Sequence, residues 1–311
     1  MDLLDKAVEH LKSGDIVAAP TDTVYGLFGD ATNDNAIKKI YEVKGRPSYN
    51  PLIVHVNGIG MAKTIAEFNA EAENIANYFW NTIKKPLTIV LKLINHNISK
   101  YVTSGLSTVA LRCPYNNIAI SLISKFNGPL AAPSANTSNK ISPTSYSMVE
   151  NDIGNKIPLI LDGGECNIGI ESTIIDLTKK PYVILRPGGV SNEDIEAFLN
   201  TTVSCDISST TIVAPGMMKK HYSPNLPIRI NATEPHEGEA FIAFGKTNKQ
   251  YDANLSMNGN LYEAAKNLFA TLNKLDNPNK YNGIAIMPIP NIGIGVGIND
   301  RIKRAAYNNK D

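Results

Sequence analysis

Apolar residues recur at helical spacing from Leu3 to Leu11, and Ser13 and Gly14 follow as helix stop signals. Helical spacing returns at 36–41, where the pattern ends near Gly45, and again at 75–83. Apolar runs of strand length lie between and after these stretches, at 15–20, 52–56, 87–93, 108–112, 159–161, 173–177 and 183–186. Strands outnumber helices, and their irregular spacing does not repeat one strand–helix unit. We therefore expect a first domain over 1–202 with an α/β fold on an open, twisted, mixed sheet.

The pattern changes after residue 202. The stretch 203–226 shows no clear hydrophobic period. It contains Pro215 and Pro224 and is followed by Pro227, which predicts an extended linker.

Regular patterns return beyond the linker. Strands are predicted at 228–230, 240–244 and 284–287, and the apolar face of 261–275 predicts an amphipathic helix. Gly293, Gly295 and Gly297 are predicted to form a turn. These features indicate a second, smaller, Rossmann-like α/β domain over 227–311.

Composition agrees with two packed domains, since the 311 residues are 43% hydrophobic and 19% charged. The 30 lysines and arginines nearly balance 29 acids, which argues against a protein that coats nucleic acid by bulk charge. Cys113, Cys166 and Cys205 lack disulfide or metal spacing. Neither a membrane span nor a signal peptide is recognisable. We expect a soluble cytoplasmic protein.

Arginine is unusually rare and unusually placed in the first domain. Residues 1–200 contain fifteen lysines but only three arginines, Arg46, Arg112 and Arg186, each one or two residues before a proline. The last two also close predicted strands, where α/β folds place ligand sites. Because the guanidinium fork matches phosphate or carboxylate oxygens, these arginines and Lys44 predict a site for a polyanion. A structural ion pair remains the alternative for one or more of them.

Loops rich in small polar residues lie before and between these arginines, at 20–26, 131–136, 162–164 and 169–173. Such groups bind nucleotide phosphates or an amino acid, although ordinary turn chemistry explains them as well. No phosphate loop, dinucleotide fingerprint or nucleophile elbow is present. His55 has no partner at metal-ligand spacing. The sequence favours catalysis by positioning and charge stabilisation, as in phosphoryl or nucleotidyl transfer.

Several motifs follow one another in a fixed order: PTDTVYGL at 20–27, KGRP at 44–47, NPLIVH at 50–55, PSAN at 133–136, GIESTII at 169–175 and LRPG at 185–188. Together they strongly resemble the YrdC-like domain of the threonylcarbamoyl-AMP synthases. The motifs APGM at 214–217 and KHYSP at 220–224 resemble the linker of the long, two-domain members. The resemblance covers 1–225 and extends to the last 85 residues by position and coarse pattern only.

The resemblance implies an enzyme that joins L-threonine, bicarbonate and ATP into L-threonylcarbamoyladenylate, with pyrophosphate and water as the other products. The product serves N6-threonylcarbamoyladenosine modification of tRNA, by way of a downstream threonylcarbamoyl transferase complex. The implied fold has a large, positively lined concave cavity, with 203–226 acting as a lid over it. Mg²⁺ is implied with ATP, held largely by the phosphates, and no residue is assigned to a metal.

The resemblance also implies site residues, by position in the motifs. The catalytic residues are Lys44, Arg46, Ser134 and Asn136. The residues that bind ATP are Lys44, Arg46, Asn50, Thr108, Ser134, Asn136, Ser142, Arg186, His221 and Tyr222. The residues that bind threonine and bicarbonate are Thr21, Thr23, His55, Arg112, Ala132 and Ser172. Two departures from the family pattern stand out: Asp22 replaces a common Glu, and Met218 and Lys219 occupy linker positions that often hold an aromatic residue.

Two other functions remain open from the sequence. A non-catalytic RNA-binding protein is one, although residues 1–200 carry 18 lysines and arginines against 20 acids. A carbamoyl transferase of the hydrogenase-maturation type is another, although its zinc-finger and acylphosphatase modules are absent. For the second domain we expect a role in holding the lid or docking a partner, with a purely structural role as the alternative. Direct contact with tRNA stays open.

Overall fold

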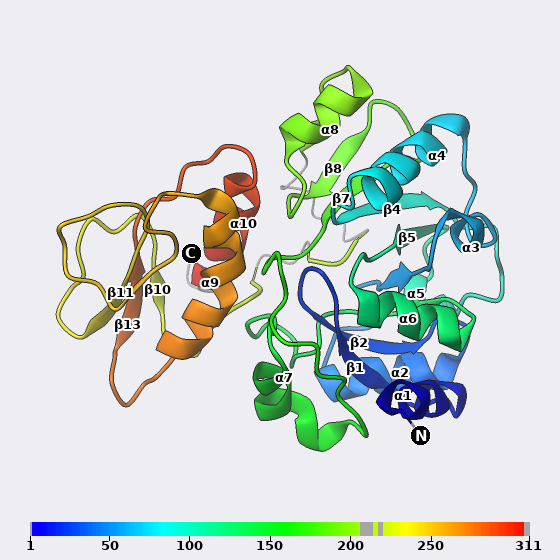
Figure 1. The fold of residues 1–311 in the computed structure, drawn as a ribbon, viewed down its shortest axis with the longest axis horizontal. Coiled ribbons are helices and arrows are strands. Elements are labelled where there is room, and N and C mark those ends of the chain that lie inside the picture. Colours follow the sequence, from blue (N-terminus) through cyan, green and yellow to red (C-terminus); the bar gives the residue numbers. More distant parts are fainter. Residues whose placement is uncertain (1, 206–213, 217–219, 308–311) are drawn as a thin grey trace.

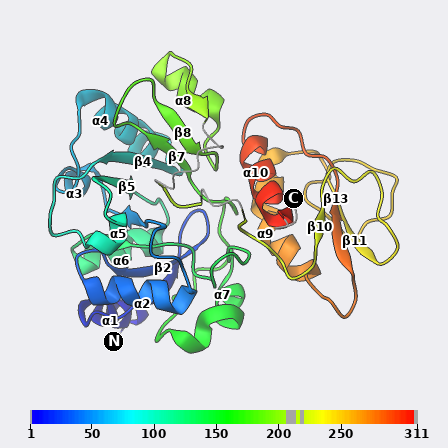
Figure 2. The same cartoon turned by 180° about the vertical axis from the view of Figure 1, so that it is seen from behind.

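The computed structural model describes residues 2–205, 214–216 and 220–307. The chain forms two α/β parts side by side, a larger one containing the N-terminus and a smaller one near the C-terminus (Figures 1 and 2). Each part has its own sheet. Within the described ranges, no helix is long and apolar enough to cross a membrane.

The larger part is built on a nine-stranded sheet, in the order β1-β2-β6-β3-β5-β4-β7-β8-β9. Its strands are β1 Val17–Pro20, β2 Tyr25–Asp30, β3 Ile53–His55, β4 Leu87–Lys92, β5 Thr108–Arg112, β6 Leu130–Ala131, β7 Thr173–Asp176, β8 Val183–Arg186 and β9 Ser204–Cys205. Parallel pairs such as β3–β5 and β4–β7 occur beside antiparallel pairs such as β4–β5 and β7–β8. The predicted mixed sheet is therefore confirmed.

One predicted strand is wrong. The run 159–161 forms only an isolated bridge, between Ile160 and Ala18 of β1. Pro158 has no N–H to extend the pairing on one side, and the turn at Gly164, with φ 72°, ends it on the other.

The helices of this part are α1 Leu3–Lys12, α2 Asp34–Lys44, α3 Ile59–Lys63, α4 Ala70–Ala76, α5 Lys100–Thr103, α6 Asn117–Phe126, α7 Tyr146–Ile153 and α8 Asn192–Leu199. The predicted helix near 36–41 is α2, which begins where the Asn33 side chain accepts from the N–H groups of Asn35 and Ala36. It ends at Gly45, in the left-handed conformation with φ 59°. The predicted helix at 75–83 is α4 followed by a π-helical segment, Asn77–Thr82.

Strand β2 is buried on both faces. Leu27 packs in one core cluster with Ile37 and Ile40 of α2, whereas Phe28 packs in another with Leu11 of α1. Successive side chains of a strand point to opposite faces, so helices cover both sides of the sheet here. This arrangement leaves the strand ends, and the loops that follow them, as the accessible polar edge of the sheet.

The smaller part has a four-stranded parallel sheet in the order β10-β13-β11-β12. Its strands are β10 Ile228–Arg229, β11 Glu239–Ala243, β12 Ala253–Asn254 and β13 Gly283–Ile286, and its helices are α9 Leu261–Leu275 and α10 Gly295–Ala306. The predicted helix over 261–275 is confirmed as α9, with Ala265, Leu268 and Leu272 buried.

The predicted turn at Gly293, Gly295 and Gly297 is wrong in part, because Gly295 and Gly297 belong to α10. A Cβ at Gly297 would lie 3.0 to 3.2 Å from backbone atoms of Gly188 in the larger part. Glycine at this position therefore allows the backbones of the two parts to come close together, and it does not form a turn.

Helices α9 and α10 face the larger part of the molecule (Figures 1 and 2). A Cβ at Gly169 would lie 2.5 Å from backbone atoms of Ala265 and Lys266 on α9. Val24 and Ile170, from loops of the larger part, belong to the same core cluster as the helices of the smaller part. The two sheets are thus separate, but the smaller part shares its core with loops of the larger one.

The predicted linker over 203–226 joins the two sheets. Residues 206–213 and 217–219 lie outside the described residues, and they include Met217 and the departures at Met218 and Lys219. The described portion includes Pro215, Gly216 and the motif residues His221 and Tyr222. The domain boundaries at 202 and 226 stay predictions.

Candidate active site

A cavity lies where loops of the larger part meet the described end of the linker. Its walls come from the loop after β1, from β3, from the end of β5, from the loops after β6 and before β7, and from the end of β8. The residues that line it are Thr21, Thr23, Val24, Gly26, Arg46, Ile53, His55, Arg112, Ala132, Pro133, Ser134, Glu171, Ser172, Arg186, Pro215, Gly216, His221 and Tyr222. Its free volume is about 50 Å³.

The loop after β1 bonds to its own backbone through a threonine hydroxyl. Thr21 Oγ1 donates to the carbonyl oxygen of Val24 at 2.7 Å and accepts from the backbone N–H of Thr23 at 3.1 Å. Thr21, Asp22 and Thr23 are all at least 98% buried. Two threonine hydroxyls are thus held on the cavity wall in one orientation.

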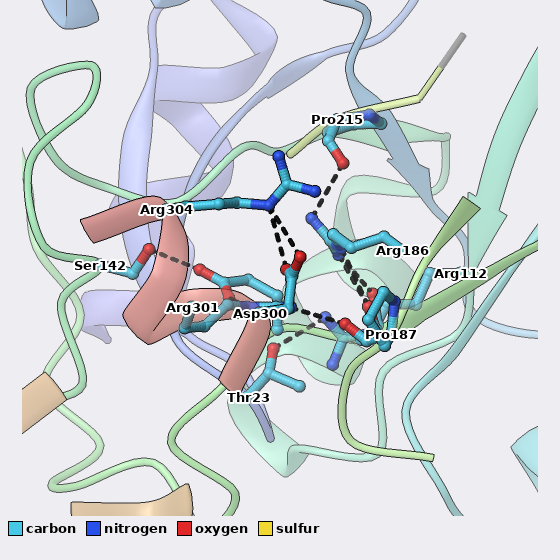
Figure 3. A network of polar contacts seen from close by, with 11 residues as sticks. Thr23, Arg112, Ser142, Arg186, Pro187, Pro215, Asp300, Arg301 and Arg304 are labelled. Atoms are coloured by element: carbon cyan, nitrogen blue, oxygen red, sulfur yellow. Dashed lines mark hydrogen bonds and ion pairs between the residues drawn. The ribbon is translucent and has the colours of Figure 1, made fainter. Parts of the chain in front are cut away.

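Arg112 closes β5 and is held by this loop (Figure 3). Its Nη1 donates to Thr23 Oγ1 at 2.8 Å, and its Nη2 donates to Asp22 Oδ2 at 2.6 Å. Arg112 therefore forms the structural ion pair that the sequence left open as an alternative, and it still lines the cavity.

Arg46 follows the C-terminus of α2 and bonds only to neutral groups among the described residues. Its Nε and Nη2 donate to the backbone oxygen and side-chain oxygen of Asn50, at 3.0 and 2.6 Å, and Nη2 also donates to the carbonyl of Pro51. Burial lowers the pKa of Arg46 to about 10. A buried guanidinium without a carboxylate partner favours an anionic ligand.

Lys44 lies behind the loop that follows β6. Its Nζ donates to the backbone oxygens of Ser134 and Asn136, at 2.6 and 2.5 Å. Burial, and then the charge of Arg46, lower the pKa of Lys44 well below its usual range. Lys44 does not line the cavity itself. It holds Ser134, which does, and adds positive potential behind it.

Arg186 closes β8. Its Nε and Nη2 donate to the Ser172 carbonyl at 3.1 and 2.9 Å, and its Nη1 donates to the Pro215 carbonyl at 3.2 Å. Burial lowers the pKa of Arg186 to about 10, and no carboxylate pairs with it in the described part of the chain. Gly216 has φ 83°, and a Cβ there would lie 2.8 Å from Arg186 Cδ. The linker therefore packs directly on this cation.

His55 lies at the end of β3 and is 2% exposed. Its Nδ1 is 3.3 Å from the carbonyl oxygen of Ile53, and its ring meets Phe28 edge-on. Burial, with the nearby charge of Arg112, lowers the pKa of His55 to about 3. The imidazole is neutral at physiological pH, so it binds through hydrogen bonds rather than charge.

Glu171 was not assigned a role from the sequence, although it lies inside the motif at 169–175. It is on the cavity wall, where its Oε1 accepts from Ser142 Oγ at 2.5 Å and its Oε2 accepts from Arg301 Nε at 2.8 Å. Arg301 and Arg186 outweigh the effect of burial and bring the pKa of Glu171 to about 2. An acidic residue in a hydroxyl-rich loop could have marked Glu171 as a site residue. Nothing in the sequence marked its partner on α10, Arg301.

His221 and Tyr222 of the linker line the cavity. Their ring centroids are 3.9 Å apart, and the Tyr222 ring packs against Phe269 of α9 at 5.4 Å. Burial lowers the pKa of His221 to about 3 and raises the pKa of Tyr222. With Pro215 and Gly216 they are the linker residues that line the cavity.

The structure brings most of the predicted site residues together. All six residues predicted for threonine and bicarbonate line the cavity: Thr21, Thr23, His55, Arg112, Ala132 and Ser172. Five of those predicted for ATP do so as well: Arg46, Ser134, Arg186, His221 and Tyr222. Lys44, Asn50, Asn136 and Ser142 lie one layer behind, each within hydrogen-bonding distance of a lining residue or its neighbour. Thr108 is at the opposite end of β5 from Arg112 and does not line the cavity.

Glu171 on the cavity wall is engaged by Ser142 and Arg301, and Asp22 behind the wall is engaged by Arg112. In the described ranges, no three histidine, cysteine or acidic side chains come together in a way that could hold a metal ion.

Two family models match the chain. Residues 9–188 match the model described as telomere recombination, and residues 190–307 match the model described as the C-terminal domain of threonylcarbamoyl-AMP synthase. The two matches meet close to the Gly188 contact between the two parts of the molecule.

Similar proteins cover nearly the whole chain. The threonylcarbamoyl-AMP synthase of Pyrococcus abyssi is 37% identical over 96% of this chain and 93% of its own. That of Bacillus subtilis is 35% identical over 97% of this chain and 92% of its own. The crystal structure of P. abyssi Sua5 complexed with L-threonine superposes with a TM-score of 0.89, covering 97% of this chain and 94% of that one. Full-length HypF, at 19% identity and a TM-score of 0.53, shares only the fold, over 60% of this chain.

Proposed function

The chain belongs to the threonylcarbamoyl-AMP synthase family, in its two-domain form, and we propose that its synthesis of L-threonylcarbamoyl-AMP takes place in the cavity between β1, β5, β8 and the linker. The observation that carries this location is the meeting of the six residues predicted for threonine and bicarbonate with Arg46 and Arg186 around one cavity. Enzymes of this family act in threonylcarbamoyladenosine modification of tRNA.

The threonine subsite is formed by the side of the cavity that Thr23, His55 and Arg112 line. The Thr21 and Thr23 hydroxyls, the neutral His55 ring and the backbone of Ala132 offer hydrogen bonds to an amino acid. Arg112 offers a guanidinium whose charge is shared with Asp22, which suits a carboxylate that must also be released. The relative from P. abyssi, seen with L-threonine, supports an amino-acid site in this fold.

The triphosphate subsite lies between Arg46 and Arg186. Both guanidiniums are buried without a carboxylate partner among the described residues, so an incoming phosphate would relieve the cost of their burial. Ser134 is held at the cavity by Lys44, while Asn50 orients Arg46. Asn136 and Ser142 support the same subsite from behind. Thr108 is not part of this proposal, because it lies at the opposite end of β5 from Arg112 and does not line the cavity.

The chemistry needs two bond changes. The amine of threonine attacks the carbon of bicarbonate, a water leaves, and a carbamate forms with the release of one proton from the ammonium form. A carbamate oxygen then attacks the α-phosphorus of ATP, and the α–β bridging oxygen leaves with pyrophosphate. Both reactants of the second step are anions, so the lysine and arginines act by alignment and by stabilising charge on the transferred phosphoryl group. Mg²⁺ enters as part of the nucleotide substrate.

The linker acts as a lid. About 50 Å³ of free space does not admit a nucleotide, and the lid residues Pro215, Gly216, His221 and Tyr222 fill the mouth. We therefore expect these residues to move away for ATP and to return over the bound reactants, which keeps water from the acyl phosphate product. On this view residues 1–202 bind and react, 203–226 close, and 227–311 hold the linker.

The decisive assay is pyrophosphate release by the full-length protein with ATP and Mg²⁺, with L-threonine and bicarbonate supplied singly and together. Release that needs both, with a product of threonylcarbamoyl-AMP mass, supports the proposal. Release without threonine, or a carbamoylated product from carbamoyl phosphate, would instead support the carbamoyl-transfer alternative. RNA binding without release would support the non-catalytic one.

A further inference from the structure

Helix α10 of the smaller part brings charged side chains to the cavity wall (Figure 3). Arg301 is completely buried, and its Nε donates to Glu171 Oε2 at 2.8 Å. Its Nη1 donates to the Pro187 carbonyl at 2.6 Å and to Asp300 Oδ2 at 2.9 Å. Because Glu171 lines the cavity and Pro187 follows β8, Arg301 bonds to the wall of a site that lies in the other part of the molecule.

The same arginine reaches further cavity residues through its neighbours. Glu171 uses its second oxygen to accept from Ser142, 2.5 Å away. The guanidinium carbon of Arg301 also lies over the Tyr222 ring, 5.3 Å from its centroid. Arg301 thus contacts both a wall residue and a lid residue.

The position of α10 is set by backbone contact. Gly297 of α10 lies directly against the backbone of Gly188. A Cβ at Gly297 would come within 3.2 Å of the Gly188 nitrogen and 3.0 Å of its oxygen. Gly188 itself is packed against the backbone of Glu171 and Ser172, where a Cβ would come within 2.6 Å. Close packing of the main chain at Gly297 and Gly188 therefore fixes the position of Arg301 relative to Glu171.

The ion pair between Arg301 and Glu171 affects the charge of a nucleotide site. A buried carboxylate on the wall of a cavity that receives a triphosphate opposes ligand binding by like-charge repulsion in a medium that screens poorly. Arg301 is the carboxylate's closest cation, with Arg186 further away on the same wall. Without Arg301, the negative charge of Glu171 would be offset only by the more distant Arg186 and by the Ser142 hydroxyl.

We propose that Arg301 is a positioning residue of the synthase site: it holds Glu171, and through Glu171 the Ser142 hydroxyl, and it cancels a negative charge that would otherwise oppose ATP. This inference rests on the proposed function for the identity of the reaction. It gives the smaller part a direct role in the site, beyond holding the linker.

The test compares full-length wild type with Arg301→Met, Arg301→Lys, Glu171→Gln and the double variant Arg301→Met/Glu171→Gln. The matched control is Arg229→Met, which breaks the Arg229–Glu239 ion pair of the smaller sheet. KM for ATP, KM for L-threonine and kcat are measured by pyrophosphate release, and ATP binding alone is measured by calorimetry.

Arg301→Met is expected to raise KM for ATP about 10-fold or more, with KM for L-threonine changed less than about 3-fold. Arg301→Lys, which keeps the charge, is expected to fall between wild type and Arg301→Met. In the double variant, removal of the unpaired carboxylate is expected to bring KM for ATP to within about 3-fold of Glu171→Gln alone. A merely structural role would not produce this rescue.

Two outcomes would overturn the inference. One is an Arg301→Met enzyme whose kinetics match those of Arg229→Met. The other is a double variant in which the two separate losses multiply, as for independent residues. If Arg301→Met fails to fold, Arg301→Lys and the double variant decide on the same criteria. If wild type releases no pyrophosphate, the proposed function fails, while calorimetry with ATP still shows whether Arg301 and Glu171 are coupled.

Discussion

Arg112 of the cavity wall and Asp22 behind it form a buried ion pair, with Nη2 and Oδ2 2.6 Å apart and the two side chains only 5% and 1% exposed. The pair joins the end of β5 to the loop after β1, 90 residues earlier in the chain. It keeps Arg112 in one orientation, with Thr23 beside it, before any ligand arrives. The part of the site proposed to bind threonine is thus organised in advance.

Asp22→Asn is expected to lower the free energy of unfolding by about 3 to 5 kcal/mol, because it leaves the Arg112 charge buried and unpaired. Urea denaturation measures the change. As a control, Glu73→Gln breaks the exposed pair with Lys63, whose side chains are 48% and 38% exposed, and should cost less than about 1 kcal/mol. Equal losses in the two variants would contradict a buried role for the Asp22 pair.

Arg46→Ala and Lys44→Ala are each expected to reduce kcat/KM by roughly 10-fold to 1000-fold, through lost stabilisation of charge on the phosphates. Pyrophosphate release under saturating threonine gives the values. Lys39→Ala, which removes an exposed lysine of the same helix, serves as the control and should keep wild-type rates. Near-normal turnover in both test variants would remove these residues from the site.

Gly216→Ala is expected to impair activity because its Cβ would meet Arg186 at 2.8 Å, in a backbone with φ 83°. Gly259 has a similar φ of 69° and open space around it, so Gly259→Ala supplies the matched strain without the clash. Both should lose about 1 kcal/mol of stability or somewhat more. Only Gly216→Ala should lower kcat/KM, and equal activities would argue against close packing of the lid on Arg186.

Stability should fall as the pH is lowered below about 6.5, the pKa of an unfolded histidine. His55 and His221 have pKa values of about 3 in the folded protein, so between pH 6.5 and 3 the unfolded chain binds protons that the folded chain does not. Each contributes about 1.4 kcal/mol per pH unit in that window. Urea unfolding at pH 7.5, 6.0 and 5.0 should show a shallower decline for His55→Asn, and an unchanged decline would refute a buried, neutral His55.

A chain ending at residue 205 should lose most synthase activity and melt at a lower temperature. It would expose Val24, Ile141 and Ile170, which share a core cluster with α9 and α10. It would also leave Glu171 without Arg301. Calorimetry and the pyrophosphate assay measure both effects, and a truncated chain with wild-type kinetics would contradict the lid and the role of α10 alike.

Local sequence determined much of the fold. The apolar face at 261–275 predicted α9, and Gly45 marked the end of α2, because side-chain periodicity and glycine's left-handed conformation act over a few residues. The same local reading failed at 159–161, where pairing with β1 extends over one residue, and at Gly295 and Gly297, where glycine serves contact between helix and loop.

The resemblance carried by the order of motifs also pointed to residues that line the cavity, in loops after β1, α2 and β6 and at the ends of β3, β7 and β8. What the sequence could not decide was pairing. Which arginine is neutralised depends on carboxylates 90 and 130 residues away, Asp22 for Arg112 and Glu171 for Arg301. Periodicity reports whether a side chain is buried, whereas the partner that makes its burial tolerable is chosen by tertiary packing alone.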